Sequence, residues 1–96
     1  MFSRRLEQYT LKRPQEVLLI HAEIEGEADR ILVFKGFSSS LMRSTAFNPD
    51  IPVLPETAKI VGGDRLKSPY NPDNPQYIQQ GLTLEALEVL FAEVGV

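Results

Sequence analysis

The strongest constraint on the fold is a period-two pattern of residues over positions 16–25, followed by a second β-rich run. One parity of the first run is apolar: Leu18, Ile20, Ala22 and Ile24. The other parity carries His21, Glu23 and Glu25. This pattern predicts a strand with one buried face. A polar break at 26–29 separates it from the run at 30–37, so the two runs predict an antiparallel hairpin.

Both ends of the chain have helical periodicity. The C-terminal stretch carries an apolar stripe of Leu84, Leu87, Leu90, Phe91 and Val94. Thr83 precedes this stripe and is a suitable N-cap, so a helix is expected from Thr83 through Val94. At the other end Phe2, Leu6 and Tyr9 share a helical face. Ser3 is the expected N-cap there, and Pro14 should end that short helix by about Lys12.

Val17 and Leu19 place apolar side chains on the second face of the first strand as well, so something must cover that face. The segment 36–40 reads as a polar interruption. Short strands are expected at 41–47 and 57–61, the latter ending at Gly62 and Gly63 in a turn into 64–67. We therefore expect a single α+β domain over residues 1–96. Its fold would be a small curved antiparallel sheet or open barrel of about four short strands, packed by a short N-terminal helix and an amphipathic C-terminal helix.

Composition excludes several classes of site. The chain has no cysteine and one histidine, which removes disulfides, thiolate chemistry and multi-histidine zinc sites. We therefore expect no metal and no cofactor. The longest apolar run, at 17–20, is far shorter than the roughly 20 residues that cross a bilayer, and no secretory signal is expected. The predicted location is the cytoplasm.

Charge is distributed unevenly along the chain. The formal net charge is −3, yet residues 68–96 carry four acidic and no basic side chains. An acidic C-terminal surface disfavours broad binding to nucleic acid. A local patch remains open as an alternative, in which basic residues near aromatic ones would bind single-stranded RNA or DNA. Its members would be Arg30, Lys35, Arg43, Arg65 and Lys67 with Phe34, Phe37, Phe47 and Tyr70.

Proline occurs with a period of three in two segments, 48–55 and 68–76. Six of the seven prolines lie in these runs, and polyproline II geometry would align them along one edge. The runs would either wrap the domain and cover sheet edges, which we favour, or dock in the groove of a partner. The run at 68–76 is the better candidate for docking, because Tyr70 and Tyr77 flank its prolines.

Catalytic chemistry has little support in the residues. Ser38, Ser39 and Ser40 follow Gly36, but no Gly-x-Ser-x-Gly elbow and no acidic residue adjacent to the one histidine accompany them. We therefore assign no catalytic residue. The remaining enzyme or small-ligand hypothesis builds a site from Glu23, Glu25 and Asp64 around His21.

Two segments carry a family resemblance: 35–47, which reads KGFSSSLMRSTAF, and 64–72, which reads DRLKSPYNP. In these residues the chain resembles a family of small proteins of unknown function found in cyanobacteria and chloroplasts. The resemblance implies a photosynthetic setting, and it implies a cyanobacterial cytosolic member without a transit peptide. It brings no reaction and no binding residue with it.

The sequence thus favours a non-enzymatic protein-binding or assembly module. A protein partner is expected, nucleic acid is the less favoured partner, and assembly into a homo-oligomer stays open. The residues predicted to contact a partner combine aromatic, basic and proline side chains. They are Phe37, Arg43, Arg65, Lys67, Pro69, Tyr70, Pro72, Pro75 and Tyr77.

Overall fold

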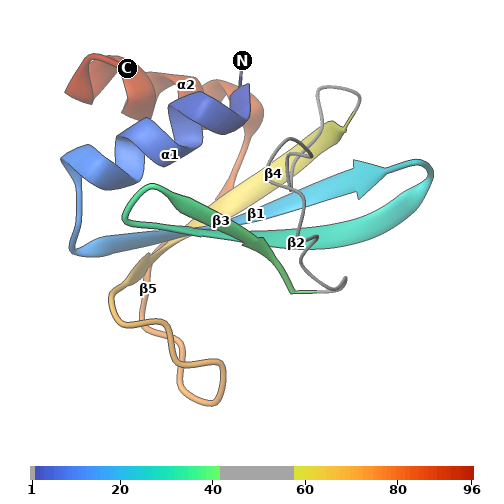
Figure 1. The fold of residues 1–96 in the computed structure, drawn as a ribbon, viewed down its shortest axis with the longest axis horizontal. Helices are drawn as coiled ribbons and strands as arrows, with labels where there is room; N and C mark the ends of the chain where they lie inside the picture. The colour runs from blue at the N-terminus through green and yellow to red at the C-terminus, as the bar shows by residue number, and fades with distance from the viewer. Residues whose placement is uncertain (1, 42–57) are drawn as a thin grey trace.

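A computed structural model, which describes residues 2–41 and 58–96, shows two helices and one antiparallel sheet in that part of the chain (Figure 1). The elements in chain order are α1 (Phe2–Lys12), β1 (Glu16–Ile24), β2 (Glu27–Phe34), β3 (Phe37–Ser40), β4 (Lys59–Lys67), β5 (Tyr77–Leu82) and α2 (Leu84–Val94). The strands are ordered β3-β2-β1-β4-β5. The expected α+β class is confirmed, but the described sheet is open and has five strands rather than about four.

Both helices pack on the same face of the sheet (Figure 1). Leu18 and Ile20 of β1 are fully buried beneath them, and the rings of Tyr9 and Phe91 lie 6.1 Å apart where the helices meet. Burying a side chain of this size stabilises the fold by about 1.5–3 kcal/mol. The predicted helical stripes are therefore the surfaces that close the main core.

The helix boundaries follow the predictions closely. Thr83 caps α2, and its side chain accepts a hydrogen bond from the backbone N–H of Ala86. α2 ends at Val94, and Gly95 follows it in the left-handed conformation with φ 77°. α1 ends at Lys12 as expected but begins at Phe2, so the prediction that Ser3 caps it is wrong. None of the helices in the described ranges is long and apolar enough to cross a membrane.

Two tight turns make the sheet larger than the sequence suggested. Glu25 and Gly26 have φ values of 53° and 81°, and Lys35 and Gly36 have values of 49° and 84°. Positive φ at both central residues is typical of two-residue hairpin turns whose twist matches the strands. The expected four-residue break at 26–29 is therefore wrong, since β2 begins at Glu27. The supposed interruption at 36–40 contains β3, whereas the strand expected at 41–47 lies almost wholly outside the described residues.

β4 runs through the glycine pair that was expected to end a strand. Gly62 and Gly63 are both buried. A Cβ on Gly62 would lie 2.6 Å from the carbonyl oxygen of Leu82, and one on Gly63 would lie 2.9 Å from Cδ1 of Ile20. The two glycines therefore allow neighbouring strands and side chains to approach closely inside a continuous strand. The prediction that the strand ends at this glycine pair and turns into 64–67 is wrong, because β4 continues to Lys67.

The face of the sheet turned away from the helices, called the second face below, carries its own apolar cluster. Val17, Leu19 and Leu66 are buried there, and Leu32, Phe34 and Tyr70 pack against them. The expectation of apolar residues on both faces of the first strand is thus confirmed. Tyr70 reaches this cluster from the β4–β5 connection.

Candidate functional site

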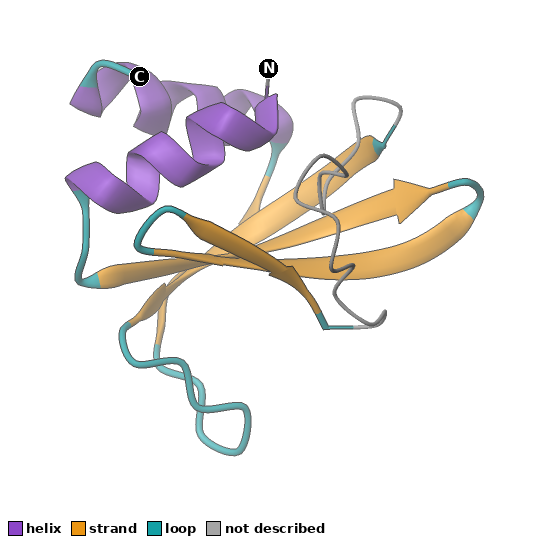
Figure 2. Ribbon diagram, viewed as in Figure 1, coloured by secondary structure: helices purple, strands orange, loops and turns teal. Residues whose placement is uncertain are grey.

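The described proline run, at 68–76, forms the connection between β4 and β5. It extends beyond the sheet, on the side away from the helices (Figure 2). The backbone N–H of Asn74 donates to the carbonyl of Asn71 at 3.1 Å, and the N–H of Asp73 donates to Oδ1 of Asn71 at 3.0 Å. These contacts make a turn with Pro72 at its second position. The run is therefore not one continuous polyproline II segment, and the described part does not lie along a sheet edge.

The predicted contact residues in this connection differ in accessibility. Pro69 and Pro72 are exposed, and Pro75 is half-buried. Tyr70 is half-buried against the second-face cluster, whereas Tyr77, the first residue of β5, keeps 43% of its surface exposed. The connection therefore presents prolines and one tyrosine to solvent, while the other tyrosine serves packing.

Three further predicted contact residues lie elsewhere. Phe37 begins β3 and is 79% exposed, at the opposite edge of the sheet from Tyr77. Lys67 is exposed at the end of β4. Arg43 lies outside the described residues. The structure thus does not bring Phe37 together with the residues of the β4–β5 connection.

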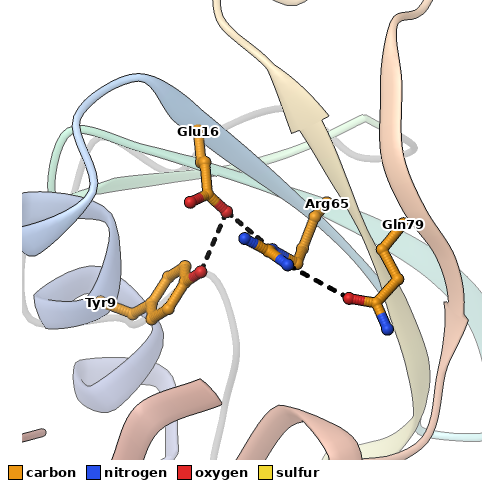
Figure 3. Close-up of polar contacts among 4 residues, drawn as sticks. All are labelled: Tyr9, Glu16, Arg65 and Gln79. Carbon is orange, nitrogen blue, oxygen red and sulfur yellow. Dashed lines mark hydrogen bonds and ion pairs between the residues drawn. The ribbon is translucent and has the colours of Figure 1, made fainter. Parts of the chain in front are cut away.

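Arg65 is held inside a polar network where the end of α1 meets the sheet (Figure 3). Its Nε donates to Oε1 of Glu16 at 2.7 Å, and its Nη1 donates to Oε1 of Gln79 at 3.2 Å. The Tyr9 hydroxyl donates to the same Glu16 oxygen at 2.9 Å. Because the Glu16 side chain is only 6% exposed, these donors satisfy a carboxylate that would otherwise be strongly disfavoured in the interior. Arg65 therefore links β1, β4 and β5 through its hydrogen bonds to Glu16 and Gln79.

The pKa values in this network follow from burial and the shared hydrogen bonds. Burial raises the pKa of Glu16, but the hydrogen bonds from Arg65 and Tyr9 outweigh burial, so its pKa lies below the ordinary value. Burial, together with the hydrogen bond to Glu16, raises the pKa of Tyr9 to about 12. The hydrogen bond to Glu16 likewise raises the pKa of Arg65. All three groups therefore keep their ordinary neutral-pH protonation states.

The basic residues proposed for nucleic-acid contact do not share one surface. Arg65 pairs across the strands with Leu18, which lies on the helix face, whereas Arg30 pairs with His21 on the second face. The Lys35 ammonium lies 5.2 Å from the centroid of the Phe34 ring. The described cations are therefore divided between opposite sides of the sheet.

His21 and Asp64 form a pair on the second face that the sequence placed 43 residues apart. Nε2 of His21 lies 2.9 Å from Oδ2 of Asp64, and Oδ1 of Asp64 accepts the backbone N–H of Gly81 at 2.9 Å. β1 supplies the histidine, β4 the aspartate and β5 the amide. The Asp64 side chain is 12% exposed and that of His21 is 40% exposed. The imidazole is thus oriented by a nearly buried carboxylate and remains accessible on its other side.

A pocket of about 420 Å³ lies next to this histidine. Its described lining comes from β1, β2 and β4: His21, Ala22, Ala28, Asp29, Arg30 and Val61. Side chains alternate along a strand, so His21, Ala28 and Arg30 project from the second face while Ala22 and Asp29 project from the opposite face. The volume falls in the range of small-molecule sites, roughly 300–1,000 Å³.

A histidine beside an aspartate is the arrangement of a general base, but the nucleophile is missing from the described site. The Ser38 hydroxyl donates to Glu7 and the Ser40 hydroxyl donates to Asp29. Within residues 2–41 and 58–96, no three His, Asp or Glu side chains converge to hold a metal ion. The polar side chains that line the described pocket include an oriented imidazole, His21, and an exposed arginine, Arg30.

Comparison with protein families places the chain. A domain of unknown function, DUF7734, matches residues 3–91. The chain belongs to this family. The match covers most of both helices and all five described strands, and the description of the family names no activity. No curated protein and no solved structure matches the chain.

Sequence reasoning anticipated part of this geometry. His21 and Asp64 were grouped with Glu23 and Glu25 as a scattered candidate site, and the structure brings the first two together. Glu23 and Glu25 are exposed near the turn of the β1–β2 hairpin, and neither is among the described contacts of His21. Arg30 was considered only as a nucleic-acid contact. Its position opposite His21 follows from the β1–β2 register, which a hairpin with a two-residue turn at 25–26 would have predicted.

Proposed function

We propose that the chain is a non-enzymatic protein-binding module that pairs an extended segment of a partner protein with the outer edge of β5. The observation that carries the proposal is the character of this edge strand. Its first five residues, Tyr77–Gly81, are all exposed, and the strand contains neither a charged residue nor a proline. Natural proteins usually block such edges with lysine, proline, bulges or a covering element, because unpaired strand edges pair with other chains. β5 has no lysine and no proline, although its register with β4 shifts at two points.

The opposite edge of the sheet shows what a protected edge looks like in the same fold. β3 has only four residues and is tied to α1 at two points. The Ser38 hydroxyl donates to Oε2 of Glu7 at 2.8 Å, and the Gly36 N–H donates to Oγ1 of Thr10 at 2.9 Å. No described hydrogen bond ties an outer group of β5 to another element in this way. This difference between the two edges favours β5 as the edge that pairs with a partner strand.

The geometry of β5 suits recognition by strand addition. In this mode main-chain hydrogen bonds supply affinity, and the side chains that flank the edge supply specificity. Tyr77 and Ile78 keep 43% and 41% of their surfaces exposed. Pro69 and Pro72 stand exposed in the connection that leads into Tyr77. A partner strand would therefore meet apolar side chains at the start of β5 and rigid proline surfaces beyond it.

The proposed setting is the cytoplasm of a photosynthetic cell. This part rests on the resemblance of segments 35–47 and 64–72 to proteins of cyanobacteria and chloroplasts. It is independent of the edge-strand argument, so the binding site and the setting can be tested separately.

Site-specific photo-crosslinking in the native host tests the proposal. A photoreactive amino acid at Ile78 is compared with the same group at Val89, an exposed apolar residue of α2. We expect a discrete adduct with a second protein from position 78 and none from position 89. The variant Ile78→Lys, with the photoreactive group moved to Gln80, should lose that adduct because an edge lysine opposes strand pairing. Val89→Lys is its matched control and should keep it.

Several outcomes would overturn this function. Equal adducts from positions 78 and 89 would show that β5 is not selective. An adduct formed only with a second copy would replace the partner protein by a homo-oligomer, which light scattering of the purified chain would confirm. Crosslinking to nucleic acid, with binding of mixed single-stranded oligonucleotides at low salt, would favour the nucleic-acid alternative, since phosphate contacts are strongest there.

A further inference from the structure

We infer that the pocket beside His21 binds a small organic anion. The Arg30 guanidinium would hold the acidic group, His21 would add a hydrogen bond, and Ala28 and Val61 would contact the apolar body of the ligand. This site is formed by β1, β2 and the start of β4, so it is separate from the β5 edge. It assigns a role to side chains that the proposed protein-binding function does not use.

Arg30 supplies the positive charge of the proposed site. It lines the pocket and is exposed, and its guanidinium has no hydrogen bond or ion pair with any described residue. Guanidinium groups bind carboxylate and phosphate groups through two parallel hydrogen bonds, and these are about twice as strong as neutral ones. An unpaired arginine on the wall of a pocket is therefore a suitable anchor for an anion.

His21 supplies a second polar group of the proposed site. It lies directly opposite Arg30 in the β1–β2 register, so both side chains project from the second face beside the pocket. Asp64 holds one ring nitrogen, and Asp64 is itself fixed by the Gly81 N–H. The other ring nitrogen has no described partner and can bond to a ligand oxygen. Asp64 also fixes the orientation of the ring before any ligand arrives, which lowers the entropy lost on binding.

The nearby carboxylates do not neutralise this site. The Asp29 carboxylate is buried on the helix side and accepts bonds from the Ser40 hydroxyl and the Arg30 backbone N–H. The Asp64 carboxylate is occupied as described above. Glu23 lies on the second face, and the register places Lys59 opposite it. Among the described residues that line the pocket, Arg30 is the charged side chain without a described partner, which favours an anionic ligand over a cationic one.

A structural role for Asp64 does not account for the whole arrangement. Asp64 lies where the β4–β5 register shifts between Gly63 and Arg65, and accepting the Gly81 N–H there satisfies an amide that the irregular ladder leaves over. This explains the aspartate. It leaves unexplained why an exposed arginine and a histidine border a pocket of about 420 Å³ with alanine and valine walls.

The chain provides a direct probe of this site, because His21 is its only histidine. Its imidazole C–H signals can be followed by NMR in the full untagged chain at fixed pH. Benzoate is the test ligand, since it joins a carboxylate to an apolar ring, and benzamide is its neutral match in shape. We expect benzoate to shift the His21 signals in a saturable manner and benzamide to produce no comparable saturation.

Three variants define the contacts. Arg30→Gln should weaken benzoate binding by at least about tenfold, because a charge-assisted hydrogen bond is lost. Arg4→Gln makes the same charge change at an exposed position of α1 and should leave binding unchanged. Ala28→Leu keeps every charge but fills the pocket, and it should also weaken binding. Arg4, Ala28 and Arg30 are exposed, so circular dichroism should show all three variants folded.

The inference is overturned by any of three results: no saturable shift with benzoate, an equal response to benzamide, or undiminished binding in Arg30→Gln. Phosphate provides the remaining comparison. Saturation by phosphate with a shift equal to that of benzoate would mean that the apolar walls contribute nothing, which contradicts the organic part of the ligand class. None of these outcomes depends on whether β5 binds a partner.

Discussion

Replacing Arg65 by methionine should expose how much of the fold depends on the buried network of Glu16, Tyr9 and Arg65. The change keeps an unbranched apolar side chain of similar length but leaves the Glu16 carboxylate with Tyr9 as its only described donor from this network. Removing one partner of a buried ion pair costs about 3–5 kcal/mol. Arg65 retains 20% side-chain exposure and the Tyr9 bond survives, so we expect the lower end, about 3 kcal/mol.

The loss should depend on pH with a defined sign. In the native chain the pKa of Glu16 is lowered from its ordinary value of 4.5, so its ionised form contributes stability above that value. This contribution disappears as the pH falls through the lowered pKa. In Arg65→Met the burial of Glu16 is opposed by Tyr9 alone, and its pKa should rise. The difference in stability between the two proteins should therefore be greatest at neutral pH and shrink as the pH falls below 4.5.

Urea unfolding followed by circular dichroism measures this difference. With a denaturant dependence of about 1–3 kcal/mol/M for a small domain, the midpoint at neutral pH should fall by roughly 1–3 M. Adding Glu16→Gln to Arg65→Met removes the unpaired charge and should recover much of the loss. A neutral-pH difference below about 1 kcal/mol, or one that does not change with pH, would refute the role assigned to this network.

Three further predictions concern single residues. Gly62→Ala should lower the free energy of unfolding by about 2 kcal/mol or more, because the new Cβ would lie 2.6 Å from the carbonyl oxygen of Leu82. An unchanged midpoint of thermal unfolding would contradict this close approach. Thr83→Ala should lower the free energy of unfolding by about 1 kcal/mol through loss of the α2 cap. Urea unfolding measures this change, and an unchanged free energy would disprove the role of the cap. The stability that Tyr9 contributes should persist below pH 10 and vanish as the pH rises through about 12; Tyr9→Phe should lack this alkaline loss, and identical alkaline unfolding of both proteins would argue against the raised pKa.

Sequence patterns predicted the helices and the first strand because each has a strong local signal. The apolar stripe that follows Thr83 predicts α2, and Pro14 predicts the end of α1. Both signals depend on neighbouring residues alone. β5 had no such signal, since Tyr77–Leu82 has no alternation of apolar and polar residues and is exposed over nearly its whole length. The predicted strand ended at Gly62 and Gly63, whereas β4 continues through them. The sequence cannot distinguish a glycine required by a turn from one required by close packing between strands.

The proline run at 68–76 shows the same limit. Its period of three predicted an extended segment, but Asn71 accepts two backbone hydrogen bonds and closes a turn at Pro72. Local spacing alone did not indicate this, although an asparagine before a proline favours a turn. The ion pair of Arg65 was not predicted for a related reason, since its partner Glu16 lies 49 residues away along the chain.

The sequence by itself determined the class of the protein, the amphipathic faces that form its core and the absence of thiol chemistry, because these depend on composition and local periodicity. Only the tertiary structure decided which polar side chains are hydrogen-bonded within the chain and which are exposed to a ligand or partner. It buried Arg65 against Glu16, joined His21 to Asp64 beside a pocket and left β5 at an uncharged edge. The physical reason is that hydrogen-bond partners across a sheet are set by strand order and register, which join residues that no local pattern connects.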